Sequence, residues 1–132
     1  MAPTNVEVVR RAWEAVTSHG ELPLELWHQD VRIDNMPEWP IRGPYHGHEG
    51  LGQWREDLAE VIENLRFELN EIIDLGADRV LSVQRARGRA VHTGIEMDHL
   101  WASVLTLRDG KITYAQGYWT PEQAREAVGL GD

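Results

Sequence analysis

Hydrophobic residues in the first part of the chain recur at helical spacing. Val9, Trp13 and Val16 lie three or four residues apart, which predicts an amphipathic helix over about residues 5–18. The sequence Thr4-Asn5-Val6-Glu7 has the form of a capping box at the start of this helix. A helix with one apolar stripe must bury it, so we expect it to pack against the remainder of the fold.

A second amphipathic helix is expected over about residues 49–64. Its apolar stripe consists of Leu51, Trp54, Leu58, Val61 and Leu65. Between the two helices, residues 22–28 favour a short helix, and residues 30–36 alternate as a short strand. The loop that follows is rich in proline and glycine and also holds Trp39, Tyr45, His46 and His48. So stiff and aromatic a loop is typical of the rim of a pocket.

The hydrophobic period changes to two from about residue 65 onward. Strands are therefore expected over residues 65–75, 79–89, 97–107 and 111–119. Between the last two, Asp109-Gly110 supplies the positive φ angles that a tight hairpin turn requires. After them, Thr120-Pro121-Glu122-Gln123 combines a capping residue, a first-turn proline and a glutamine, which predicts a helix to about Val128.

This order of elements predicts a single α+β domain over residues 1–132. Four consecutive strands with short connections form an antiparallel meander, and the earlier helices must cover one of its faces. A strongly curved sheet wrapped over a long helix makes a cone, whose open end is a natural ligand pocket. The expected fold is thus a cone-shaped, mostly antiparallel sheet over the N-terminal helices.

Composition and charge exclude several classes of function. The chain has no cysteine, which excludes disulfides and thiolate chemistry. Its formal net charge of -9 argues against nucleic acid and anionic membranes as partners. No apolar run approaches the roughly 20 residues of a membrane helix, and Met1 to Asn5 lack the pattern of a signal peptide, so a cytoplasmic location is expected. We expect no cofactor and no metal, because His46 and His48 have no obvious third ligand.

The chain resembles the SnoaL-like branch of the nuclear transport factor two-like superfamily, which includes ketosteroid isomerases, limonene epoxide hydrolases, scytalone dehydratases and polyketide cyclases. The resemblance rests on Tyr45-His46-Gly47-His48-Glu49-Gly50-Leu51, on Leu107-Arg108-Asp109-Gly110-Lys111-Ile112, and on Tyr118-Trp119 before the last helix. It spans essentially the whole chain and implies the cone-shaped, cystatin-like α+β roll. The fold hosts many reactions, and some of its members only bind ligands.

Individual residues resemble parts of two family sites. Met97-Asp98-His99-Leu100 is similar to the isomerase segment whose protonated aspartate donates a hydrogen bond to the developing oxyanion. Asn35-Met36-Pro37 is similar to the hydrolase segment in which an asparagine holds the attacking water, and Arg85 falls near the hydrolases' active-site arginine. The isomerase's general base falls on Asn35, and the two hydrolase aspartates fall on Arg87 and Gly117. The resemblances together therefore imply a composite site.

In this composite site, the catalytic residues would be Asp98, Asn35 and Arg85. A carboxylate in an apolar strand is costly to bury unless it is neutral or paired, so Asp98 is either an ionised base beside Arg85 or a protonated donor. Asn35 would orient a water molecule or a substrate carbonyl. The substrate-binding residues would be Trp13, Tyr45, Trp54, Arg87 and Trp119. The implied activity is cofactor-independent isomerase, lyase or cyclase chemistry on a small, mostly apolar molecule.

Other interpretations of the same residues stay open. Asp98 and Arg85 can form a purely structural cross-strand pair, and the six tryptophans can belong to the core. The chain is then a non-catalytic small-ligand-binding protein, a hydrolase with a rearranged site, or a dimerisation domain. If Asp98 lies on the concave face of the sheet, Met97, His99 and Trp101 lie on the convex face. A sheet face with an exposed tryptophan predicts a homodimer through that surface.

Overall fold

The computed structural model describes residues 4–19, 22–41 and 43–130, and the side chains of residues 16–19, including the predicted stripe residue Val16, lie outside the description. The elements follow in the order α1 (Asn5–His19), η1 (Leu24–Leu26), β1 (Trp27–Asp34), β2 (Tyr45–His46), α2 (Gly47–Val61), β3 (Ile62–Gly76), β4 (Arg79–Ala90), β5 (Glu96–Arg108), β6 (Lys111–Tyr118) and α3 (Pro121–Ala127). Each helix and long strand expected from the sequence is present, with bounds shifted by a few residues. No helix in the described part of the chain is both long and apolar enough to cross a membrane.

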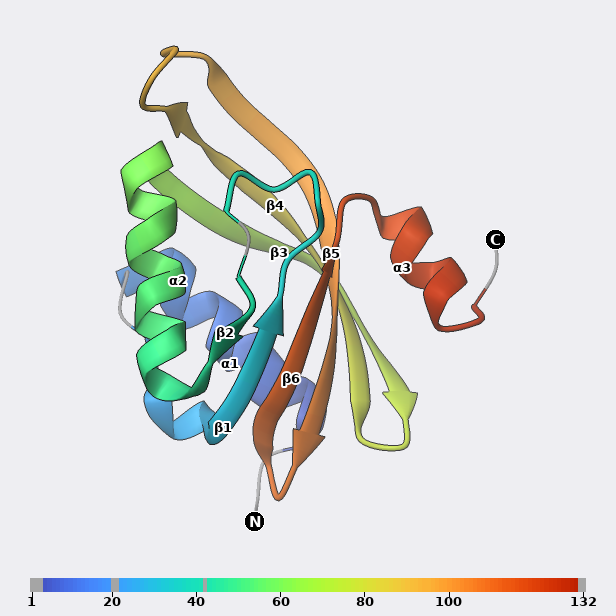
Figure 1. The fold of residues 1–132 in the computed structure, drawn as a ribbon. Helices are drawn as coiled ribbons and strands as arrows, with labels where there is room; N and C mark the ends of the chain where they lie inside the picture. The colour runs from blue at the N-terminus through green and yellow to red at the C-terminus, as the bar shows by residue number, and fades with distance from the viewer. Residues whose placement is uncertain (1–3, 20–21, 42, 131–132) are drawn as a thin grey trace.

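The strands form one mixed sheet in the order β2-β1-β6-β5-β4-β3. Strands β3 to β6 make the predicted antiparallel meander. Strand β1 pairs in parallel with β6, which places an early strand beside a late one in the middle of the sheet. Figure 1 shows α1 and α2 on one side of the sheet and α3 on the other. The α+β class with a curved sheet over the N-terminal helices is confirmed.

Local signals fixed the ends of these elements. The Thr4 side chain accepts a hydrogen bond from the first turn of α1. Asp109 and Gly110 both have positive φ angles, 53° and 75°, as a tight hairpin turn requires. Thr120 and Gln123 cap α3 reciprocally, in the predicted capping box. These signals act within a few residues, so the sequence alone was enough to place them.

Two separate cores lie on the two faces of the sheet. On the concave face, Trp13 packs edge-on against Phe67 and Trp101, at ring-centroid distances of 5.3 and 5.7 Å. On the convex face, Ala102 and Val104 of β5 are buried in a smaller cluster with Ala124 of α3. Because α3 covers the convex face there, the second half of β5 is buried and apolar on both faces.

The double burial of β5 overturns one prediction. Trp101 belongs to the concave core, and Met97 packs against that core, so these residues and His99 between them lie on the concave side of the strand. The expectation that Met97, His99 and Trp101 form an exposed convex surface is wrong. The alternation of apolar and polar residues along β5 could not show which face is concave, because α3 packs on the convex face and makes its residues apolar too. A homodimer stays a prediction.

Candidate functional site

A small cavity of about 30 Å³ lies inside the cone, where α1, α2 and the concave face of the sheet meet. Its lining consists of Trp13, Trp27, Ile33, Asp34, Asn35, Trp54, Trp101, Ser103, Ala115 and Gly117. These residues come from α1, β1 and its C-terminal end, α2, β5 and β6. The volume is close to the share of one water molecule in the liquid. The side chains around this cavity therefore leave room for about one water molecule.

Three of the predicted site residues meet at this cavity: Trp13, Asn35 and Trp54. Tyr45 and Trp119 are not in its lining. The Tyr45 hydroxyl donates a hydrogen bond of 2.6 Å to Asp57, and the Trp119 ring stacks on His99 at 3.8 Å. Trp13, Asn35 and Trp54 thus remain candidates for ligand contact.

The predicted inward orientation of Asp98, Arg85 and Arg87 is wrong. The Asp98 side chain is 57% exposed, and one of its oxygens lies 3.5 Å from Arg85 Nε and 3.7 Å from Arg87 Nε. All three lie on the convex face, where Arg87 is the direct cross-strand neighbour of Asp98. Ion pairs this exposed contribute about 0–1 kcal/mol. This geometry fits a structural ion pair between strands. Asp98 lies on the face of the sheet opposite the cavity, so its carboxylate cannot contact a ligand there.

A chain of buried polar side chains runs from α1 across the sheet to the cavity. Trp13 Nε1 donates to Ser82 Oγ at 3.1 Å, and Ser82 donates to Gln84 Oε1 at 2.9 Å. Gln84 Nε2 then donates to Ser103 Oγ at 3.1 Å. Ser82 and Gln84 are fully buried, and Ser103 ends the chain in the cavity wall. Hydrogen bonds that all point the same way polarise one another, so Ser103 becomes a better donor at the cavity.

Sequence reasoning missed this polar chain, although the strand pattern contains its signal. Ser82 and Gln84 alternate with Leu81, Val83 and Arg85 on β4 and so face the concave side with the helices. Polar residues at two successive inward positions are unusual enough to indicate a buried network.

Four tryptophans have a buried indole N–H that finds no acceptor among the described residues: Trp27, Trp39, Trp54 and Trp101. Three of the four, all except Trp39, line the cavity. Leaving a buried donor unpaired costs about 1–3 kcal/mol. Several such donors around one cavity therefore mark it as more than a packing defect.

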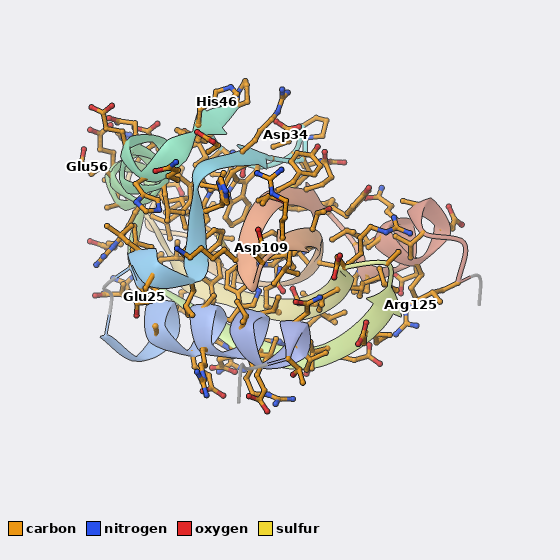
Figure 2. The ribbon with its side chains drawn as sticks, turned by 90° about the horizontal axis from the view of Figure 1, so that it is seen from below. Glu25, Asp34, His46, Glu56, Asp109 and Arg125 are labelled. Atoms are coloured by element: carbon orange, nitrogen blue, oxygen red, sulfur yellow. The ribbon has the colours of Figure 1, made fainter. Side chains whose placement is uncertain are left out.

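Asp34 contributes to the cavity lining, but its carboxylate is engaged elsewhere. It accepts hydrogen bonds from the Tyr114 hydroxyl at 2.6 Å and from Arg32 Nε at 2.9 Å. Burial raises the pKa of Asp34, but these hydrogen bonds and the charge of Arg32 outweigh burial and hold the pKa below its ordinary value. Burial and the bond to Asp34 raise the pKa of Tyr114 to about 12. Figure 2 shows Asp34 and His46 at the same edge of the molecule, where His46 also lowers the Asp34 pKa.

Within the described residues, no group of three or more histidine, aspartate or glutamate side chains is placed to hold a metal ion. His46 and His48 do not belong to such a group among the described residues. His48 Nε2 lies 2.8 Å from the backbone carbonyl of Trp27 and donates to it, which ties the start of α2 to β1.

Comparison with protein families gives a match to the SnoaL-like domain over residues 9–115. No curated protein matches the chain at a significant level. The family match covers α1 from its second turn and every strand to the middle of β6, so it includes all cavity-lining elements.

Several solved structures share the fold. An NTF2-like protein of unknown function from Burkholderia pseudomallei is 20% identical, with a TM-score of 0.77 over 94% of this chain and 96% of that one. A hypothetical protein with a ketosteroid isomerase-like fold from Catenulispora acidiphila, solved in complex with trimethylamine, is 19% identical, with a TM-score of 0.74 over 98% of this chain and 95% of that one. TerC, co-crystallised with polyporic acid, is 20% identical, with a TM-score of 0.73 over 95% and 98%. At these identities the likeness establishes the fold alone.

Proposed function

The chain belongs to the SnoaL-like domain family, and from this premise we propose that it binds a small, mostly apolar molecule inside the cone. The observation that carries the proposal is the convergence of four tryptophans on one cavity. Trp13, Trp27, Trp54 and Trp101 reach it from α1, β1, α2 and β5, respectively. Aromatic walls with a few placed polar groups are typical of small-molecule sites. Two proteins of the same fold, the trimethylamine complex and TerC, were crystallised with small molecules.

A cavity of about 30 Å³ admits such a ligand only if part of its surroundings moves. Trp39 is the best placed to move. It lies between β1 and β2, in a segment whose described residues form neither helix nor strand, and its ring stacks on Trp101 at 5.5 Å and 23°. Figure 1 shows this segment as a loop that extends beyond the end of β1 before the chain returns to β2. Because no strand pairing holds it, the Trp39 ring can leave Trp101 while the sheet stays intact.

The proposal is tested by binding indane, a flat hydrocarbon close to indole in size, measured by calorimetry with wild type and Trp39→Ala. Removal of the Trp39 ring is expected to strengthen indane binding, because the ligand no longer competes with it for Trp101. Trp119→Ala is the matched control, since it removes a partly buried tryptophan away from the cavity and should leave indane affinity unchanged. Absence of binding to both wild type and a folded Trp39→Ala variant would refute the proposal.

A cofactor-independent isomerase, lyase or cyclase is the second candidate. Its specific support is the position of Asp34 beside Asn35 in the cavity lining, where a carboxylate and an amide can contact the same ligand. Native mass spectrometry of freshly purified protein would identify a co-purifying molecule. Catalysis predicts that wild type converts this molecule and that a folded Asp34→Asn variant binds it unchanged. Equal conversion by the variant would remove Asp34 from the mechanism.

A further inference from the structure

The donors around the cavity outnumber the acceptors that the protein offers them. The indole N–H groups of Trp27, Trp54 and Trp101 are buried without an acceptor in the described part of the chain. All three residues are at most 6% exposed, so bulk water does not reach these groups. By contrast, the Trp13 N–H is satisfied by Ser82 at 3.1 Å. Among the four cavity-lining tryptophans, Trp27, Trp54 and Trp101 are therefore the ones whose N–H lacks an acceptor.

Ser103 adds a fourth donor to the cavity lining. Its oxygen accepts from Gln84 at 3.1 Å, so its own hydroxyl hydrogen takes no part in that hydrogen bond. The bond from Gln84 is the last of three that run in one direction from Trp13, which strengthens the Ser103 hydroxyl as a donor. The carboxylate nearest the cavity does not serve these donors, because Asp34 is bonded to Tyr114 and Arg32.

This inference rests on the proposed function. We infer that the ligand is a planar molecule with a hydrogen-bond acceptor, such as an aromatic or conjugated ketone. Its carbonyl oxygen is directed at the donors of Trp27, Trp54, Trp101 and Ser103. A carbonyl oxygen has two lone pairs and no hydrogen, so it satisfies two of these donors at once without bringing a donor of its own. An ammonium cation would leave all of them unsatisfied. The same donors therefore select for carbonyl compounds and against ammonium cations.

The experiment compares 1-indanone with indane, which share a bicyclic frame and differ by one carbonyl oxygen, and adds trimethylamine as a cationic probe. Calorimetry on wild type is expected to give at least about tenfold tighter binding of 1-indanone than of indane, and no binding of trimethylamine. Ser103→Ala is expected to weaken 1-indanone several-fold and to leave indane unchanged. If wild type binds too weakly to measure, Trp39→Ala serves as the parent for the same comparison.

A second readout follows the donors directly. Protein labelled with ¹⁵N in the indole rings of its six tryptophans gives one N–H signal for each. With 1-indanone, the proton signal of at least one of Trp27, Trp54 and Trp101 should move downfield, and that of Trp13 should stay in place, because its hydrogen bond already exists. Signals are assigned with single Trp→Phe variants.

The outcomes separate this inference from the proposal on which it rests. Equal affinities for 1-indanone and indane, with no downfield indole shift, would overturn the inference and leave small-molecule binding standing. Tighter binding of trimethylamine than of 1-indanone would also overturn it. If neither bicyclic compound binds to wild type or to Trp39→Ala, the proposed function fails and the inference fails with it.

Discussion

Replacing Trp13 and Trp39 by phenylalanine, one at a time, tests whether the unpaired indole groups are real. The two tryptophans are matched, because both lie in the concave core at 6% and 2% exposure, and each packs against Trp101. Both substitutions remove the same atoms from a buried ring. They differ in one respect: the Trp13 N–H has an acceptor in Ser82, and the Trp39 N–H has none among the described residues.

The expected difference follows from the hydrogen-bond energies. Trp13→Phe loses a hydrogen bond worth about 0.5–1.5 kcal/mol, whereas Trp39→Phe removes an unpaired donor whose burial costs about 1–3 kcal/mol. The loss of packing is similar in the two variants and cancels in the comparison. Trp13→Phe should therefore be the less stable variant by about 1.5–4.5 kcal/mol.

Urea unfolding followed by far-ultraviolet circular dichroism measures this difference without depending on tryptophan fluorescence. For a small domain the free energy of unfolding falls by about 1–3 kcal/mol per molar urea, so a difference of about 2 kcal/mol separates the midpoints by about 0.7–2 M. Equal destabilisation of the two variants would refute the reasoning. It would mean that the Trp39 N–H has an acceptor after all, and the same comparison would then be required for Trp27, Trp54 and Trp101.

Further predictions concern the other features of the fold. Asp98→Asn should lower the free energy of unfolding by no more than about 1 kcal/mol and leave indane affinity unchanged, because the carboxylate is exposed; a loss of binding would contradict the convex placement. Tyr45 and Tyr114, with pKa values raised to about 12, should ionise well above the ordinary tyrosine range. Their contribution to stability is fully present below about pH 10 and lost as the pH rises through about 12, since the unfolded chain gives up these protons first; ultraviolet titration should lose one late step in Tyr114→Phe. Thr120→Ala should lower the free energy of unfolding by about 0.5–2 kcal/mol, because it removes the N-terminal cap of α3. Thr113→Ala is the control, since Thr113 is a strand residue that caps no helix. Light scattering coupled to size exclusion is expected to show a homodimer, and a monomer near the chain mass of 15.1 kDa would end that prediction.

Features that depend on neighbouring residues could be predicted from the sequence. The capping box at Thr120 and the turn at Asp109-Gly110 work through atoms within a few residues, and both are confirmed. The single apolar stripe around Trp13 correctly placed this residue against the sheet. The fold class was also predicted, because short connections between alternating strands leave few arrangements other than a meander.

The orientation of β5 could not be predicted, because it depends on a distant element. Leu100, Ala102 and Val104 are as apolar as the residues of the concave face, since Ala124 of α3 packs over them. Alternation alone therefore allowed two orientations of the strand, and resemblance to an isomerase segment favoured the wrong one. Asp98 was placed inside the cone for this reason. The site residues that were correctly placed, Trp13, Asn35 and Trp54, all come from elements with one apolar side or from a strand end.

The parallel pairing of β1 with β6 also has a consequence for the synthesis of the protein. Strand β1 leaves the ribosome well before its central partner β6, which emerges roughly eighty residues later. Until β6 is in place between β1 and β5, the sheet is incomplete and the aromatic side chains of the concave core stay exposed. Exposed apolar surface of this kind can associate with other nascent chains. A chain arrested before Lys111 would therefore be a client for chaperones or proteases.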